Sequence, residues 1–323
     1  MKGQHEVYVR NRRKVAFRFT LKRNITVVRG NSGTGKTTLY DMIAAHMRNN
    51  AGDAVNLTCD KPCMALTDHD WQHQLSGFHD SIVFVDEGAG YLSSEDFASA
   101  VRYSDNYYVL FTRIPLHQLP YSVDEIYHIK TSGKYHTLVP AYRQRMGLVY
   151  GVSSRSRAPY AILLTEDSKS GLQFFEARLS REGVACLTSS GRPGIYKWLK
   201  EHAGQRVFVV ADGAAFGPEA KRVLALQEQH PQSIRICLPE SFEWLLMKSG
   251  VLHDAHVEEV LEDPARFIES SEYSSWEQFF TALLRQRTQG TPFEYDKQKL
   301  SDAWTVEHNA DKVMGAIAHG NVR

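Results

Sequence analysis

Residues 25–38 read ITVVRGNSGTGKTT, and this stretch decides the expected fold of the first half of the chain. It contains the pattern G-x-x-x-x-G-K-[ST], which is typical of loops that bind nucleotide phosphates. The β-branched run at its start predicts a buried strand over 25–28, and apolar residues at helical spacing predict a helix over 38–48. Because a strand and a helix flank the loop, a phosphate-binding loop is favoured over a chance glycine-rich turn.

The chemistry of this loop predicts ATP as its ligand, together with Mg²⁺. Glycines allow successive backbone N–H groups to face phosphate oxygens. Lys36 is expected to bring a positive charge to the β- and γ-phosphates, and Thr37 a hydroxyl group to the metal. The expected nucleotide-binding residues of the loop are Gly30, Asn31, Ser32, Gly33, Thr34, Gly35, Lys36, Thr37 and Thr38.

A second apolar run, residues 81–85, predicts a central strand that ends at Asp86 and Glu87. Ligands of parallel sheets lie beyond the carboxyl ends of the strands, so both acids are expected near the phosphates. Asp86 is predicted to bind Mg²⁺, and Glu87 to act as the general base that activates a water molecule. The alternative is a strand that ends in a solvated acidic turn.

A third buried strand is expected over 107–111, followed by Thr112 and Arg113. Thr112 is a candidate for sensing the γ-phosphate, and Arg113 for contacting a phosphate in its own or a neighbouring subunit. Pairing of Arg113 with a local carboxylate is the equally weighted alternative.

These motifs together resemble P-loop ATPases of the additional-strand type, the group that includes ABC-like ATPases. The resemblance covers residues 25–129 and implies a parallel sheet and ATP hydrolysis. Residues 75–77 match the start of the ABC signature, but Phe78 and His79 follow where Gly-Gln is expected, so we predict a turn there. Residues 38–80 are too few for the helical insertion of transporter-type members. A homo-oligomer and a monomer both stay open, as does a small-molecule kinase built on the same loop.

The length of 323 residues suggests about two domains, which we place at 1–150 and 151–323, with a linker over 152–159. The second half alternates between strand and helix patterns, which predicts another parallel α/β sheet. Two further apolar helices are expected to follow it. The expected strands are 160–165, 184–188, 206–211 and 233–238, and the expected helices are 171–181, 193–202, 218–229, 241–250 and 276–287.

Acidic residues follow the expected strands of this second sheet, namely Glu166-Asp167, Asp212 and Glu240. Carboxylates gathered at one sheet edge suit a Mg²⁺ ion for phosphodiester chemistry. The layout is similar to the TOPRIM fold of topoisomerases, primases and certain nucleases. That resemblance implies catalytic and metal-binding roles for Glu166 and Asp212, but Ala214 stands where the family has a second Asp. The alternative is a generic flavodoxin-like domain whose acids cap helices.

An ATPase followed by a TOPRIM-like domain resembles the overcoming-lysogenization-defect nucleases and related bacterial anti-phage proteins. The resemblance implies an ATP hydrolase whose second domain acts on or senses nucleic acid in antiviral defence. The alternative is a nucleotide-gated scaffold that binds a partner protein and has no nuclease activity.

Charge is unevenly distributed along the chain. Nine basic residues and one acid precede Gly30, whereas eight acids and one arginine lie between Asp254 and Glu277. One interpretation is a nucleic-acid-binding face and an acidic face that repels nucleic acid. The other is that the two segments neutralise each other, within one chain or between subunits. The candidates for nucleic-acid contact are Arg10, Arg12, Arg13, Lys14, Arg155 and Arg157.

No apolar run reaches the ~20 residues that a membrane-spanning helix needs, so no membrane association is expected. Four cysteines are too few for a disulfide framework, which favours a reducing cytoplasm. Cys59, Cys63, His69 and His73 are chemically suited to zinc, but known zinc fingers separate their ligand pairs by a longer segment. We therefore expect these four to be ordinary loop and helix residues.

Overall fold

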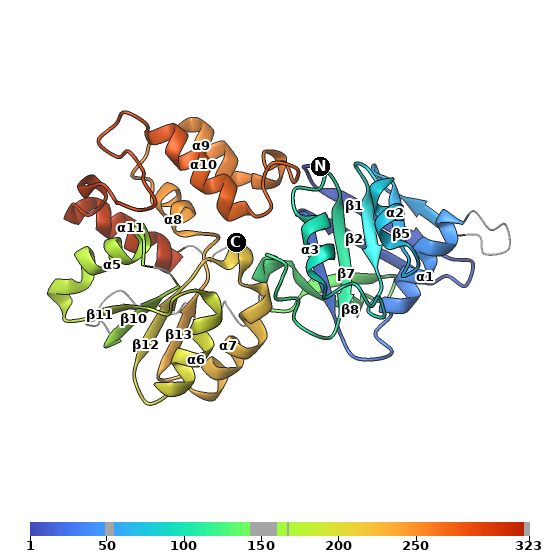
Figure 1. The fold of residues 1–323 in the computed structure, drawn as a ribbon, viewed down its shortest axis with the longest axis horizontal. Coiled ribbons are helices and arrows are strands. Elements are labelled where there is room, and N and C mark those ends of the chain that lie inside the picture. Colours follow the sequence, from blue (N-terminus) through green and yellow to red (C-terminus); the bar gives the residue numbers. More distant parts are fainter. Residues whose placement is uncertain (49–54, 143–159, 167, 320–323) are drawn as a thin grey trace. The chain divides into compact units, whose positions relative to one another are not determined.

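The computed structural model describes residues 1–48, 55–142, 160–166 and 168–319 (Figure 1). The chain divides into two compact units. The first contains residues 1–142 and 262–275, and the second contains residues 143–261 and 276–323. The expected linker at 152–159 lies outside the described residues.

The described residues of the first unit form a nine-stranded sheet in the order β4-β1-β2-β9-β8-β3-β7-β6-β5. Strands β8, β3, β7, β6 and β5 run parallel to one another, whereas β4, β1 and β2 form an antiparallel extension. Strand β9 joins the two parts, because it pairs antiparallel with β8 and parallel with β2. The strands are β1 (His5–Arg10), β2 (Ala16–Leu21), β3 (Ile25–Arg29), β4 (Asn56–Thr58), β5 (Cys63–Leu66), β6 (Ile82–Val85), β7 (Tyr107–Thr112), β8 (Ile126–Thr131) and β9 (His136–Pro140). The sheet is thus mostly parallel, and the expectation of a parallel sheet needs correction at this antiparallel extension.

Three α-helices are described in the first unit: α1 (Lys36–Met47), α2 (Trp71–Ser76) and α3 (Glu95–Val101). The unit also contains two 3-10 turns, η2 (Val123–Glu125) before β8 and η5 (Pro264–Arg266) in the segment 262–275. The expected turn at residues 75–77 is wrong, because Leu75 and Ser76 form the last turn of α2 and only Gly77 caps it. Leu75 is buried, and this apolar contact extends the helix to the position where the sequence suggested a turn.

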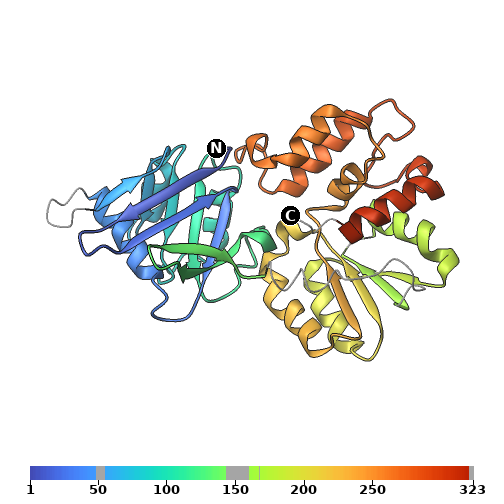
Figure 2. The ribbon, with the colours of Figure 1, turned by 180° about the vertical axis from the view of Figure 1, so that it is seen from behind.

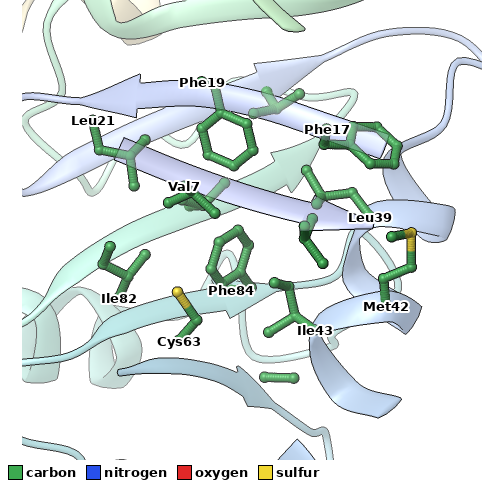
Figure 3. Packing of buried hydrophobic residues seen from close by; sticks show 14 of the residues in the cluster. Val7, Phe17, Phe19, Leu21, Leu39, Met42, Ile43, Cys63, Ile82 and Phe84 are labelled. Atoms are coloured by element: carbon green, nitrogen blue, oxygen red, sulfur yellow. The ribbon is translucent and has the colours of Figure 1, made fainter. Parts of the chain in front are cut away.

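Apolar side chains of β1 and β2 pack against α1 and the parallel strands, and this packing forms the core that supports the loop (Figure 3). Phe17 and Phe19 of β2 face Leu39 of α1 and Phe84 of β6. Strands β3 and β6 are buried along their whole length, as their unbroken apolar pattern predicts. The carboxyl end of β3 therefore leads from a rigid core into the glycine loop.

Residues 262–275 pack on the first unit, although the sequence placed them with the second half. The Gly3 amide donates to the Ala265 carbonyl at 2.7 Å, and the Asn24 side chain donates to the Ser274 carbonyl at 3.0 Å. The amino terminus forms an ion pair with Glu269. Part of the acidic segment thus meets the start of the basic segment within one chain.

The described residues of the second unit form a four-stranded parallel sheet in the order β11-β10-β12-β13. Its strands are β10 (Ile162–Thr165), β11 (Ala185–Thr188), β12 (Val207–Val210) and β13 (Ile234–Cys237). Its helices are α5 (Ser170–Leu179), α6 (Arg192–Glu201), α7 (Gly217–Gln229), α8 (Phe242–Lys248), α9 (Ala255–Glu262), α10 (Trp276–Thr288) and α11 (Glu307–His319), with 3-10 turns η3 (Ser180–Glu182), η4 (Gly213–Ala215) and η6 (Asp302–Trp304). The expected alternation of strands and helices is confirmed.

Helices cover both faces of this second sheet. Figures 1 and 2 show α6 and α7 together on one face and α5 with α11 on the other. Strand β10 is followed by β11 on one side and β12 on the other, so the strand order reverses at β10. Such a reversal places the carboxyl ends of β10 and β12 at the point where open α/β sheets bind ligands.

Candidate functional site

The glycine loop takes up a conformation that other residues would strain. Gly33 and Gly35 have φ angles of +82° and +95°, in the left-handed region that favours glycine. A Cβ atom on Gly30 would lie 2.8 Å from the Thr34 hydroxyl oxygen, so this position also excludes a side chain. The loop is thus shaped by its glycines, as the motif requires.

Lys36 is the first residue of α1, and only 4% of its surface is exposed. Its Nζ donates to the carbonyl oxygens of Gly30 at 2.6 Å and Asn31 at 3.0 Å. A carboxylate oxygen of Glu87 lies 3.4 Å from the same nitrogen. The ammonium group is therefore held across the mouth of the loop, where a phosphate would find both its charge and its N–H donors.

Glu87 and Arg113 form a two-pronged ion pair. The Arg113 Nε and Nη2 donate to the two carboxylate oxygens of Glu87 at 3.2 Å and 2.5 Å. Arg113, followed by Lys36, lowers the pKa of Glu87 below its ordinary value. Arg113 was expected either to contact a phosphate or to pair with a local carboxylate. The structure shows the pairing, and its partner is Glu87, the predicted general base.

Asp86 lies at the carboxyl end of β6, beside Glu87. Its Oδ1 is buried and has no hydrogen-bond partner in the described part of the chain. Burial, followed by the charge of Asp86, raises the pKa of Asp41, which lies one turn after Thr37 on α1. A buried carboxylate oxygen without a donor, close to a second carboxylate, is a position that a divalent cation would stabilise.

A cavity of about 490 Å³ brings much of this site together. Its wall combines residues 32–38 of the loop with Glu87 and Arg113, and Thr37 and Thr38 are exposed in it. An apolar side is built from Val15, Phe17, Ile129 and His136, and the rings of Phe17 and His136 stack with centroids 4.8 Å apart. The cavity is large enough for a small organic ligand, with charged groups at one end and an apolar wall at the other.

Four of the predicted residues lie outside this cavity lining, namely Gly30, Asn31, Asp86 and Thr112. The Thr112 hydroxyl donates to the Ile114 carbonyl at 2.9 Å and accepts from the Ile114 amide at 3.1 Å. Thr112 is 2% exposed. Its hydroxyl is used to shape the turn after β7, and this local role is one that the sequence pattern does not distinguish from γ-phosphate sensing.

The second unit gathers carboxylates at the carboxyl ends of β10 and β12. Glu166 and Asp212 line a small pocket of about 30 Å³ together with Glu243 of α8 and Lys297. The Lys297 Nζ lies 2.9 Å from a carboxylate oxygen of Glu277 and 3.7 Å from one of Glu243. Glu243 is 1% exposed and accepts a hydrogen bond of 2.8 Å from the Tyr295 hydroxyl. An ammonium group thus lies among the acids.

Asp212 has a strongly perturbed environment in this pocket. Burial, followed by the charges of Glu166, Glu277 and Glu243, raises its pKa well above the ordinary 3.8, while Lys297 opposes the shift. Its Oδ1 accepts the Phe242 amide at 2.9 Å. These observations favour a protonated or lysine-compensated carboxyl at this position.

The two sites differ in how well they fit Mg²⁺. In the first unit, a hydroxyl and one or two carboxylates are the protein ligands that Mg²⁺ commonly uses when phosphates supply the rest. In the second unit, Lys297 already supplies a cation to the acids, and Ala214 supplies no ligand. No group of three or more acids, histidines or cysteines among the described residues is placed to share an ion. Because Lys297 lines this pocket and opposes the raised pKa of Asp212, a metal ion between Glu166 and Asp212 would compete with its ammonium group.

No family model, curated protein or solved structure matches this chain.

The residues considered for zinc lie in several elements: Cys59 follows β4, Cys63 begins β5 and His73 lies in α2. All four cysteines of the chain are free thiols. Arg155 and Arg157 lie outside the described residues. None of the described helices combines the length and apolar character that a membrane span requires.

Sequence reasoning missed three residues that the structure adds to the two sites. Asp41 could have been found from its spacing, because it lies four residues after Thr37 on the same helix face. Glu243 is less clearly indicated by the sequence, where it is an acid in a mostly apolar stretch of α8. Lys297 lies in an irregular segment, and nothing in its local pattern distinguishes it from a surface lysine.

Replacing Lys297 by methionine should destabilise the second unit. The change leaves Glu243 and Glu277 without their shared cation, and Glu243 is buried. About a fifth of the Lys297 side chain is exposed to solvent, which weakens its ion pairs. We therefore expect the free energy of unfolding to fall by only ~2 kcal/mol and the Tm by ~4–8 °C. Calorimetry measures the shift, and Lys299→Met, two residues away and exposed, is the matched control. Equal Tm values for the two variants would show that Lys297 does not neutralise the acids.

The variant Asp212→Asn should stabilise the protein at neutral and alkaline pH. The folded state holds the Asp212 proton more tightly than the unfolded state, so wild-type stability falls as pH rises above the ordinary pKa of 3.8. Asparagine carries no charge and can still accept the Phe242 amide. Thermal melts at pH 8 should show a Tm higher by ~2–4 °C, and the gain should disappear near pH 4. Glu259→Gln on exposed α9 is the control. A lower Tm at pH 8 would contradict the raised pKa.

Proposed function

We propose that the first unit binds ATP with Mg²⁺ at residues 30–38 and hydrolyses it. The observation that carries this proposal is the convergence of the glycine loop, Lys36, Glu87 and Arg113 on one cavity of about 490 Å³. The phosphates would lie at the charged end, on the backbone N–H groups and Lys36. The nucleobase would lie against Ile129 and His136, whose ring is backed by the buried ring of Phe17.

The strand order supports the same proposal. Strand β7 lies between β3, which leads into the loop, and β6, which ends at Asp86 and Glu87. An additional strand in this place is what the resemblance to additional-strand P-loop ATPases implies. Thr37 and Asp86 would hold Mg²⁺, which supplies positive charge to the phosphates when bound. Glu87 would accept a proton from the attacking water once the phosphates compete for its two cations.

Titration with a fluorescent ATP analogue tests the binding step. We expect saturable binding in Mg²⁺, weaker binding in EDTA, and displacement by unlabelled ATP. GTP in the same competition measures the base preference, which depends on contacts with the cavity wall. Failure of the unmodified protein to bind any nucleoside triphosphate would remove the proposal altogether.

For the second unit we propose a partner-binding role in preference to metal-dependent cleavage of nucleic acid. The specific observation is Lys297, which lines one pocket with Glu166 and Asp212 and lies 3.7 Å from a carboxylate oxygen of Glu243. The resemblance to anti-phage nucleases remains the basis of the competing proposal. Incubation of single- and double-stranded DNA and RNA with Mg²⁺ or Mn²⁺ separates the two. Cleavage that is lost in Glu166→Ala would establish the nuclease, and the wild-type protein would then also gain thermal stability from the metal.

A further inference from the structure

A groove lies on the face of the antiparallel extension that is opposite the buried side chains of β1. Its volume is about 1060 Å³, roughly twice that of the nucleotide cavity. Strands β1 and β2, dark blue in Figure 2, form its floor, and the green β8–β9 hairpin lies beside them. The groove is separate from the glycine loop, because none of the residues 30–38 lines it.

The side chains of the groove follow from the two-residue period of its strands. In β1, Val7 and Val9 are fully buried, so Tyr8 and Arg10 project to the opposite face. Tyr8 lies directly opposite Arg18 of β2, in a row that continues to Thr58 of β4. The β8–β9 turn adds a second aromatic ring. The described residues that line the groove are Gln4, Glu6, Tyr8, Arg10, Lys14, Ala16, Arg18, Thr58, Cys59, Asp60, Gly133, Lys134 and Tyr135.

The groove has an excess of positive charge. It holds two acids, of which Glu6 forms an ion pair with Arg18 and Asp60 lies within hydrogen-bond distance of His5. Three further cations, Arg10, Lys14 and Lys134, are exposed along its length. Their charges come from β1, from the β1–β2 turn and from the β8–β9 turn, so they are spread along the groove rather than gathered at one point.

Two half-buried tyrosines accompany these cations. Tyr8 comes from the floor and Tyr135 from the neighbouring hairpin, and both hydroxyl groups are close enough to Arg18 to affect its pKa. Aromatic rings within a basic groove are how proteins bind single-stranded nucleic acid, because bases stack on the rings while the cations follow the phosphates. A duplex keeps its bases stacked on each other and offers none to the tyrosines.

We infer that this groove binds single-stranded nucleic acid, with Tyr8 and Tyr135 stacking on bases and Arg10, Lys14 and Lys134 contacting phosphates. The inference is independent of the proposed ATP hydrolysis, since it involves other residues. It also gives Arg10 and Lys14, two of the arginines and lysines singled out in the sequence, a specific place in a binding surface. An acidic segment of a partner protein would use the cations but not the rings, and the test separates that case.

Fluorescence anisotropy with a labelled oligo(dT) of about 12 nucleotides tests the inference, because this length falls within common single-strand site sizes. Tyr8→Ala and Tyr135→Ala should each weaken binding about 5- to 150-fold without changing its dependence on salt. Tyr8→Phe keeps the ring and should bind like the wild type. All these side chains lie at the surface, and thermal melts confirm that the variants fold.

The cations are tested by the salt dependence of the same binding. Arg10→Gln and Lys134→Gln should each reduce the slope of log K against log salt by about 0.7, because each removes one phosphate contact. Lys248→Gln, exposed in the second unit, is the control that should change nothing. Absence of binding to oligo(dT) at low salt, equal binding of a duplex of the same length, or unchanged affinity in both alanine variants would overturn the inference. Tighter binding of a poly-glutamate peptide than of oligo(dT) would overturn it in favour of an acidic protein partner.

Discussion

Replacing Lys36 by alanine is expected to abolish ATP binding at micromolar concentrations. The loop holds the ammonium group in place, because Lys36 Nζ donates to the carbonyl oxygens of Gly30 at 2.6 Å and Asn31 at 3.0 Å. A charge-assisted contact with two phosphates is lost in the variant. We expect affinity to fall by on the order of 100-fold, from the cost of hydrogen bonds to charged groups. Isothermal titration with Mg-ATP measures the change directly.

The loss of ATP binding in Lys36→Ala has to be separated from a loss of loop structure. Lys36 is buried and its Nζ donates to the Gly30 carbonyl of the loop, so its removal also loosens the loop. Thr37→Val is a second variant that keeps side-chain shape at an exposed position and removes only the hydroxyl expected on Mg²⁺. It should weaken binding in Mg²⁺ and leave binding in EDTA unchanged. Lys22→Ala, an exposed lysine outside the cavity lining, is the charge control. Unchanged ATP affinity in Lys36→Ala would show that the cavity holds another ligand.

The parts of the fold that the sequence could predict are those whose pattern is unbroken. Strands β3 and β6 are buried along their whole length, and the β-branched run at 25–28 and the apolar run at 82–85 predict both of them. The alternation of strands and helices after residue 160 is local information of the same kind. The positions of Lys36 and Glu87 in one site then follow, because parallel strands end at the same edge of a sheet.

The antiparallel extension was missed for a different reason. Strand β1 alternates buried and exposed residues, with Val7 and Val9 on one face and Glu6 and Tyr8 on the other. This alternation is the pattern of a half-buried strand, and it indicates the strand but not its partners. Which neighbours β1 would find depends on contacts with β2 and β4, and one of these lies more than forty residues away. Local patterns do not contain such pairings.

The positions of strand ends predict only part of the carboxylate pocket in the second unit. Glu166 and Asp212 do line one pocket, as the topology predicts. The residue that changes its chemistry, Lys297, is 85 positions after Asp212 and belongs to an irregular segment. Only the three-dimensional structure places an ammonium group among those acids. A metal site predicted from carboxylates alone takes no account of this cation, which lines the same pocket.

Glu87→Gln should bind ATP but lose most of its turnover. Glutamine keeps the size of the side chain and can still accept a hydrogen bond from Arg113, but it cannot accept a proton from water. Loss of a general base costs ~10²–10⁴-fold in rate. Phosphate release measured at saturating ATP gives the turnover, and titration confirms that affinity is retained. Glu95→Gln, an exposed acid in the first turn of α3, should hydrolyse ATP like the wild type.

The ion pair with Arg113 gives this experiment a second readout. Arg113 is the largest cause of the lowered pKa of Glu87, followed by Lys36. In Arg113→Gln the pKa of Glu87 should therefore rise toward its ordinary 4.5. Since a base acts only when deprotonated, the acid limb of the pH profile of kcat/KM should move to higher pH in this variant.

A purely structural role for Glu87 predicts a different set of results. If Glu87 only anchored Arg113, then Glu87→Gln and Arg113→Gln would reduce turnover by similar small factors, because each breaks the same contact. The pH profile would then keep its shape in both variants. A large loss of rate in Glu87→Gln, together with a shifted acid limb in Arg113→Gln, requires the carboxylate to accept a proton during turnover. The arginine would then hold that carboxylate until phosphate oxygens compete for its guanidinium group.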